Sequence, residues 1–263
     1  MIDVYKLSRG KFPILVSMPH NGSLIPESIS NKMTESAKMS KDTDWFLDKL
    51  YNFCTEMELS IIEPIFSRYV IDLNRSEDDE NLYPGADTTG LCPTSQFDKT
   101  PIYLPGNEPT AEDIEARVEQ FWRPYHNALK AELVRLKERH GRVLLFEAHS
   151  IKSEVPRFFD GVLPDFNFGD NSGKSTSHNL HKRINDWQPE AYSKVFNQRF
   201  KGGYITREYG VPDDNMESLQ LELSQATYMN EDELSYNDER AKQVQVELRA
   251  LFNNLKEYVA SKF

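Results

Sequence analysis

The chain of 263 residues contains few cysteines and no long apolar run. Cys54 and Cys92 are its only two cysteines, and a secreted protein of this length without a disulfide framework would be unusual. No stretch approaches the ~18 apolar residues of a membrane-spanning helix, and the N-terminal sequence MIDVYKLSRGKF lacks an apolar core followed by a cleavage site. We therefore expect a cytoplasmic protein that is neither exported nor inserted into a membrane.

The chain also lacks an excess of positive charge. It has 42 acidic and 31 basic side chains, which give a formal net charge of -11, and no local basic patch interrupts this balance. Such a charge opposes binding to nucleic acids and to anionic membranes, because both carry phosphate groups of the same sign. We therefore expect neither a nucleic acid nor a membrane as a partner.

Motifs of the common nucleophilic and phosphate-binding enzymes are absent. The sequence has no G-x-S-x-G elbow, and FGDNSGKS lacks the glycine spacing of a phosphate-binding loop. Cys54 lies on the apolar stripe of a predicted helix, which favours a core position. Cys92 has no cationic neighbour close in sequence to activate its thiol. These absences argue against a serine or cysteine nucleophile.

Apolar patterning alternates between strand and helix along the whole chain, and no linker divides it, so we predict a single domain over residues 1–263. The alternation predicts an α/β fold with a mainly parallel or mixed twisted sheet and helices on both faces. A long loop is predicted over 77–107. The predicted strands are 12–20, 60–66, 68–74, 142–150, one within 158–173, and 216–229; the predicted helices are 42–57, 110–139 with a kink at Pro124, 174–187 and 231–263.

Polar residues stand at the ends of three predicted strands. His20 follows ILVSMP, His149 follows RVLLFEA, and Asn74 with Arg75 follows YVIDL. Ligands of open parallel sheets bind beyond the carboxyl ends of the strands. We therefore expect these four side chains to share one site.

Two histidines with a carboxylate form the three-ligand, open type of catalytic zinc site. Asp44 and Asp42, at the start of the helix predicted after His20, are the nearest acidic candidates. The alternative is that each histidine is an ordinary hydrogen-bonded polar residue, and spacing alone does not decide between the two. The other histidines are weaker candidates: His126, His140, His178 and His181.

Asn74 and Arg75 suit a substrate carboxylate, because arginine binds it through two parallel hydrogen bonds and asparagine adds another contact. The alternative is an ordinary ion pair of Arg75 with Asp72, Glu77 or Asp78.

Glu222 shares the predicted strand LQLEL with leucines, so partial burial would raise the pKa of its carboxyl group, as a general base requires. The alternative is a solvated residue that points away from the core.

Eight segments of the chain together point to one family. They are SMPHNGSLIP, DTDWFLDKLY, SRYVIDLNR, FWRPYHNAL, EAHSI, PDFNFGDNSG, GGYITREYG and LQLELSQATYM. In this order they resemble motifs of the N-formylglutamate amidohydrolase family, and the resemblance covers about 13–229. The family is related to zinc carboxypeptidases and aspartoacylases, which implies a phosphorylase/hydrolase-like α/β fold and one bound zinc ion or another divalent metal.

The resemblance implies roles for individual residues. His20 and His149 match the histidines that would bind zinc. Many carboxypeptidase relatives have a glutamate three residues after the first histidine, where this chain has Ser23, so we expect Asp44 as the third ligand and Asp42 as the reserve. Glu222 would be the general base. The expected substrate contacts are Asn74 and Arg75 on one carboxylate, Arg207 on the other, and Arg68 and His126 as weaker candidates.

The resemblance also implies a reaction, the hydrolysis of a dicarboxylic N-acyl amino acid. N-formyl-L-glutamate, cleaved to formate and L-glutamate, is the expected small-molecule substrate. Two alternatives stay open at this point. One is another zinc deacylase or carboxypeptidase, acting on an N-acyl-aspartate or a peptide, and the other is a binding protein of the same fold without turnover.

Overall fold

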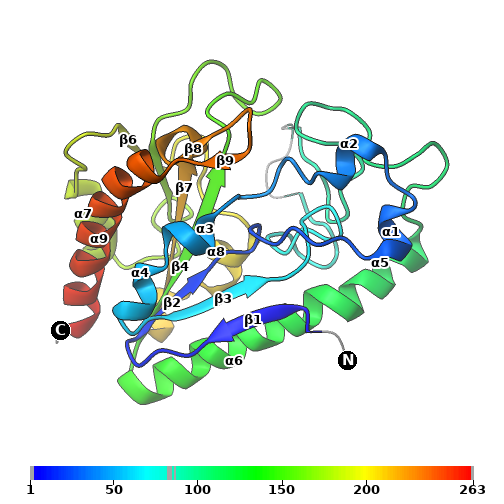
Figure 1. The fold of residues 1–263 in the computed structure, drawn as a ribbon. Helices are drawn as coiled ribbons and strands as arrows, with labels where there is room; N and C mark the ends of the chain where they lie inside the picture. The colour runs from blue at the N-terminus through cyan, green and yellow to red at the C-terminus, as the bar shows by residue number, and fades with distance from the viewer. Residues whose placement is uncertain (1–2, 82–84, 86, 262–263) are drawn as a thin grey trace.

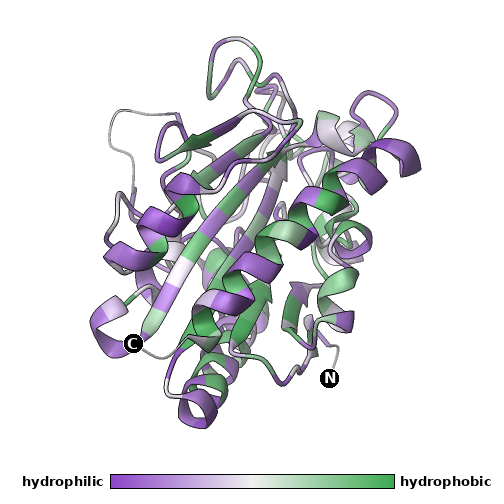
Figure 2. Ribbon diagram, turned by 90° about the vertical axis from the view of Figure 1, so that its left-hand side faces the viewer, coloured by the Kyte–Doolittle hydropathy of each residue, from purple (hydrophilic) through white to green (hydrophobic). Residues whose placement is uncertain are grey.

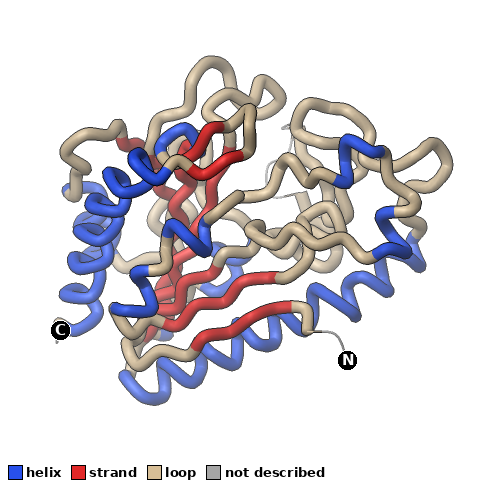
Figure 3. Tube along the Cα trace, in the orientation of Figure 1, coloured by secondary structure: helices blue, strands red, loops and turns tan. Residues whose placement is uncertain are grey.

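A twisted sheet of seven strands runs through the centre of the part that the computed structural model describes, residues 3–81, 85 and 87–261 (Figures 1 and 3). Its strand order is β1-β3-β2-β4-β7-β5-β6. β3, β2, β4 and β7 are parallel, β1 is antiparallel to β3, and β5 is antiparallel to β7. The strands are β1 (Tyr5–Ser8), β2 (Ile14–Ser17), β3 (Ser60–Pro64), β4 (Val143–Ile151), β5 (Phe166–Gly169), β6 (Lys194–Phe196) and β7 (Met216–Ser224), with β8 (Met229–Asn230) and β9 (Ser235–Tyr236) forming a separate pair.

Helices surround this sheet, as predicted (Figure 3). Among the described helices, none combines the length and the apolar character needed to cross a membrane. The helices are α1 (Glu27–Ser30), α2 (Glu35–Lys38), α3 (Leu47–Leu50), α4 (Phe53–Glu56), α5 (Ala111–Arg117), α6 (Arg123–His140), α7 (His178–Asp186), α8 (Tyr204–Tyr209) and α9 (Asp238–Ala260).

Two apolar cores lie on opposite faces of the sheet. Successive side chains of a strand point to opposite faces, and the buried residues of β2 and β4 divide in this way. Ile14 and Phe146 pack in one core with α7 and α9, while Leu15 and Leu145 pack in the other with α6. Figure 2 shows the apolar segments of the strands and the inner sides of these helices facing one another. The α/β fold with helices on both faces is therefore confirmed.

The helix predicted over 110–139 forms as α5 and α6 joined by a π-helical turn, Val118–Trp122. Thr110 and Asp113 form a capping box at its start, and Gly141 ends it in a left-handed conformation. The π-turn ends two residues before Pro124, where the sequence predicts a kink. A wider turn at this point accommodates a residue that cannot donate a backbone hydrogen bond.

The single helix predicted over 42–57 is wrong. The chain forms the one-turn helices α3 and α4, and Phe46 before them has a left-handed φ of 64°. Tyr51 and Phe53 are both fully buried in the same core. Residues two apart in a helix point about 200° away from each other, so one straight helix would not bury both. Asp44 consequently lies in an irregular segment rather than at a helix start.

The strand predicted over 68–74 is also absent from the structure, although most of this run is buried. Its backbone groups are paired outside the sheet. The amide of Asp72 donates to Leu91 O, the Arg117 guanidinium donates to Val70 O, and the His126 ring binds Leu73 O. These tertiary bonds replace a strand ladder, so the apolar run folds as a buried loop that carries Asn74 and Arg75. The prediction of a long loop over 77–107 is confirmed for its described residues, which contain no helix or extended strand.

Gly169, at the end of β5, allows a close approach of the segment 200–202. A Cβ atom at this position would lie 2.6 Å from Lys201 C and 2.7 Å from Phe200 O, both of which are backbone atoms. We expect Gly169→Ala to lower the free energy of unfolding by about 2 to 3 kcal/mol, because the backbone must shift to admit the methyl group. Urea unfolding followed by circular dichroism measures this loss.

The control is Gly106→Ala. Gly106 has a positive φ of 77°, but a Cβ there would meet no atom within 4 Å, so we expect a loss of only about 1 kcal/mol from backbone conformation. Equal losses in the two variants would contradict the close approach at Gly169.

Candidate active site

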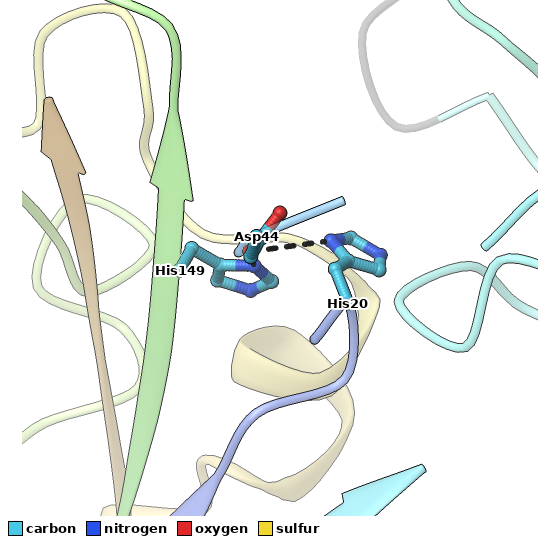
Figure 4. A group of neighbouring side chains, drawn as sticks. All are labelled: His20, Asp44 and His149. Atoms are coloured by element: carbon cyan, nitrogen blue, oxygen red, sulfur yellow. Dashed lines mark hydrogen bonds and ion pairs between the residues drawn. The ribbon is translucent and has the colours of Figure 1, made fainter. Parts of the chain in front are cut away.

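Three buried side chains of metal-ligating types meet at the carboxyl edge of the parallel strands. His20 lies three residues after β2, His149 lies near the end of β4, and Asp44 comes from the irregular segment before α3. One ligand atom from each lies within 4.8 Å of the others, and Figure 4 shows the three side chains converging. The strand ends thus bring together the two predicted histidines.

The acidic member of this group is Asp44 rather than Asp42. Asp44 Oδ2 lies 3.1 Å from His149 Nδ1 and 3.9 Å from His20 Nδ1, and it accepts a hydrogen bond from the backbone amide of Ser150. Asp42 instead accepts hydrogen bonds from the Tyr69 hydroxyl and the Phe97 amide. Asp42 therefore anchors neighbouring loops.

A second carboxylate binds the outer nitrogen of each histidine. His20 Nε2 lies 2.6 Å from Asp72 Oδ1, and His149 Nε2 lies 2.6 Å from Glu147 Oε1. Glu147 also accepts a hydrogen bond from the Thr206 hydroxyl. In protein metal sites a ligating histidine usually donates a hydrogen bond from its second ring nitrogen to a carboxylate in this way. The other ring nitrogen is then unprotonated and can bind the metal. The donor set therefore fits a divalent metal such as zinc.

Arg68 lies beside His20 and Asp72 and affects the protonation of the His20 ring. Its guanidinium donates to Asp72 Oδ2 at 2.8 Å and lies 3.2 Å from His20 Nδ1. Burial and the Arg68 cation lower the pKa of His20, which favours the neutral ring that a metal ligand needs. Burial also opposes charge on His149, but the Glu147 and Asp44 carboxylates outweigh it and raise the pKa of His149 well above its usual value.

Glu222 lies on β7 directly opposite His149 in the β4–β7 register. Burial raises the pKa of Glu222 to about 8, against the opposing effect of the His149 charge. Within the described part of the chain, no hydrogen bond to its carboxylate is present. Glu222 is thus a buried carboxyl group whose oxygens remain available to a bound molecule.

A cavity of about 170 Å³ joins these residues. His20, Asp44, His149 and Glu222 all line it. Other polar lining residues include Arg68, Asp72, Asn74, Arg75, Asp87, Arg199 and Gln220, and the apolar part of the wall includes Phe97, Ile151, Phe158 and Phe200.

Asn74 and Arg75 line the cavity, although they lie on a loop and not at a strand end. Asn74 Oδ1 accepts a hydrogen bond from the Ile205 amide, and its Nδ2 lies 3.0 Å from His149 Nε2. Arg75 donates to Asp79 at 3.3 Å, so the acid in its ion pair is none of those considered from the sequence. The pair is placed to contact a ligand of the cavity.

Arg207 and His126 do not line the cavity formed by the described residues. Arg207 lies on α8, and its Nε donates to the carbonyl oxygen of Gly202. His126 is buried on α6, where its ring lies between the Tyr209 hydroxyl and the Leu73 carbonyl oxygen. It supports the loop that carries Asn74 from behind.

Sequence reasoning missed the carboxylates behind the histidines, and it missed Arg199. Glu147 carried a usable signal, because it stands two residues before His149 and residues two apart in a strand share a face. Asp72 and Arg199 had no such signal, since each lies on an irregular segment whose path depends on tertiary contacts.

The sheet is parallel at its centre and has a cavity at its carboxyl edge. The cavity holds a buried group of metal-ligating residues beside a glutamate, so the molecule is an α/β protein with a site of the hydrolytic type. The family model for N-formylglutamate amidohydrolase matches residues 12–229, and the chain belongs to this family.

Named relatives agree with this family. An N-formylglutamate deformylase from Pseudomonas putida is 43% identical over 266 residues, covering 100% of this chain and 99% of that protein. One from Pseudomonas aeruginosa is also 43% identical, with 97% of each chain covered. The crystal structure of an N-formylglutamate amidohydrolase from Ralstonia eutropha JMP134 matches with a TM-score of 0.84 and 26% identity over 98% of both chains. The chain is therefore an enzyme of the amidohydrolase class.

His126 predicts a pH dependence of stability. Burial lowers the pKa of His126 to about 4 in the folded chain, while an unfolded histidine has a pKa near 6.5. Between pH 6.5 and about pH 4, His126 therefore binds a proton in the unfolded state but not in the folded state. We expect this residue alone to reduce the free energy of unfolding by about 2 kcal/mol between pH 7 and pH 5.

The measurement compares urea unfolding of the natural chain and His126→Gln across this pH range. Glutamine can accept from Tyr209 and donate to the Leu73 carbonyl oxygen, but it does not titrate. The free energy of unfolding of the natural protein minus that of His126→Gln should fall by about 2 kcal/mol between pH 7 and pH 5. Parallel curves would show that His126 is not a buried neutral histidine.

Proposed function

We propose that this protein hydrolyses N-formyl-L-glutamate to L-glutamate and formate. The observation that carries the proposal is the single cavity that holds His20, Asp44 and His149 beside Glu222, with the Asn74–Arg75 pair in its wall. The two Pseudomonas relatives bear the name of this reaction and are aligned over nearly the whole chain.

His20 Nδ1, His149 Nδ1 and an Asp44 carboxylate oxygen would hold one zinc ion or another divalent metal. Such an ion supplies Lewis acidity, which lowers the pKa of water and polarises a carbonyl group. Asp72 and Glu147 keep the two rings in the tautomer and orientation that this ligation needs.

Glu222 would move the proton of the reaction. Its carboxylate accepts a proton from water as the water oxygen attacks the formyl carbon. The same group then gives the proton to the amine nitrogen as the carbon–nitrogen bond breaks, so that formate and L-glutamate are the products. A pKa raised by burial suits a group that must both accept and release a proton near neutral pH.

Arginines and Asn74 would orient the substrate. The Asn74–Arg75 pair would bind its α-carboxylate, and the Arg68 guanidinium would stabilise the negative charge that develops on the formyl oxygen. Fixing the amide in this way converts part of the binding energy into correct alignment with Glu222.

We also propose that the enzyme works in the cytoplasm. Cys54 and Cys92 are both buried free thiols. Unpaired cysteines of this kind are typical of proteins in reducing compartments.

Replacing a metal-binding residue should remove both metal and activity. In His149→Ala we expect the bound zinc to fall from about one ion per chain to near zero and kcat/KM for N-formyl-L-glutamate to fall by at least about 100-fold. Metal analysis of the purified protein and a formate-release assay measure the two effects.

His140→Ala is the matched control, because His140 is exposed at the end of α6, beside the start of β4, whereas the cavity lies at the other end of that strand. It should keep metal and activity, and circular dichroism should show both variants folded. Full activity of His149→Ala without zinc loss would refute the proposed metal site.

Glu222→Gln should separate proton transfer from metal binding. Glutamine preserves the shape of the side chain but cannot accept the proton, so we expect kcat to fall by about 10² to 10⁴-fold. The zinc content should stay the same, because Glu222 is outside the ligand group. A variant that keeps more than a tenth of the natural kcat would rule out Glu222 as the base.

A further inference from the structure

Arg199 projects from the segment between β6 and α8 into the cavity wall. Its Nε donates to the carbonyl oxygen of Phe158 at 2.6 Å, and its guanidinium carbon lies 5.9 Å and 5.6 Å from the ring centres of Phe158 and Phe200. These contacts fix one edge of the guanidinium and leave its two terminal nitrogens for another partner.

The aromatic residues that hold Arg199 belong to a small third apolar cluster. Ile151, Val155 and Leu163 form its centre, and Phe97, Phe158 and Phe200 are among the rings packed around them. Because Ile151 is the last residue of β4, this cluster extends from the strand that carries His149. Arg199 is therefore held by packing continuous with the sheet edge that bears the site.

The arginines that line the cavity differ in how their charge is balanced. Arg68 is paired with Asp72 at 2.8 Å, and Arg75 with Asp79 at 3.3 Å. For Arg199, no carboxylate of residues 3–81, 85 and 87–261 lies within the 4.0 Å of an ion pair. A half-buried guanidinium without a counter-ion is suited to bind an anionic group of a ligand.

A glutamate-like substrate presents two carboxylates, and the Asn74–Arg75 pair accounts for only one. We propose that Arg199 binds the side-chain carboxylate of the substrate and so determines the preference for acidic over neutral N-formyl amino acids. The inference rests on the proposed function. Arg199 takes this role in place of Arg207, to which the family resemblance gave it, because the Arg207 Nε is directed to Gly202 and Arg207 is not among the residues that line the cavity.

The test compares N-formyl-L-glutamate with N-formyl-L-glutamine, which differ by one carboxylate and are nearly equal in shape. The zinc-loaded natural enzyme and Arg199→Met are assayed for kcat and KM on both. We expect the glutamate-to-glutamine ratio of kcat/KM to fall by about 10- to 100-fold in Arg199→Met, mainly through a higher KM for N-formyl-L-glutamate.

Two further variants sharpen this result. Arg207→Met should retain the natural ratio, and a collapse of the ratio in Arg207→Met instead of Arg199→Met would overturn the inference. Arg249→Met controls for the loss of a cation elsewhere on the chain, because Arg249 is a partly exposed residue of α9 that pairs with Glu56. It should leave both rates as in the natural enzyme.

Calorimetry separates failure of this inference from failure of the proposed function. Binding of L-glutamate and L-glutamine is measured for the natural protein and Arg199→Met. A preference for L-glutamate that disappears in Arg199→Met supports the inference even if N-formyl-L-glutamate is not hydrolysed, in which case only the proposed reaction fails. Hydrolysis with an unchanged ratio in Arg199→Met refutes the role of Arg199 alone. Absence of both hydrolysis and preferential L-glutamate binding in the natural protein refutes both.

Discussion

The site depends on two hydrogen bonds between histidine rings and buried carboxylates. A neutral imidazole donates from one nitrogen and accepts at the other, so a neutral ring that donates from Nε2, His20 to Asp72 or His149 to Glu147, offers its Nδ1 lone pair to a metal. Both Nδ1 atoms then face the Asp44 carboxylate, which the Ser150 amide holds in place. The three candidate ligands are thus positioned by the protein itself.

On one face of the central strands, apolar side chains pack at one end and residues of the candidate site lie at the other end. Along β4, Val143 and Leu145 belong to the core under α6, and the next two residues on that face are Glu147 and His149. The β4–β7 register places Glu222 opposite His149. A slip of one residue would turn every side chain of β7 to the other face, so the leucines of the opposite core also fix the position of the proposed base.

The sequence predicts the parts of the site that depend on short-range pattern. His149 and Glu222 follow from strands with clear apolar residues, and both strands form as predicted. The residue pattern does not separate Asp44 from Asp42, because the choice depends on the path of an irregular segment, and only the family resemblance favours Asp44. That path includes the left-handed Phe46, and the helix predicted there is broken into two single turns.

The loop that carries Asn74 and Arg75 shows a different limit. Its apolar residues match a buried strand, but their backbone groups are satisfied by Arg117 and His126, which lie about fifty residues further along the chain. No local pattern contains that information. The same limit applies to Arg207, which the family resemblance favours for the second carboxylate. Only the tertiary structure shows that Arg199 lines the cavity and that the Arg207 Nε is directed to Gly202.

Net charge and site charge are separate properties of this chain. The acidic total of -11 bears only on large anionic partners, whose phosphates meet the whole surface. Inside the cavity, Arg68 pairs with Asp72 and lies 4.0 Å from Asp44, and Arg75 pairs with Asp79. The aromatic cluster holds Arg199, which has no carboxylate partner among the described residues. An acidic protein can therefore select a small dianion, because recognition there is decided by a few desolvated groups and their fixed geometry.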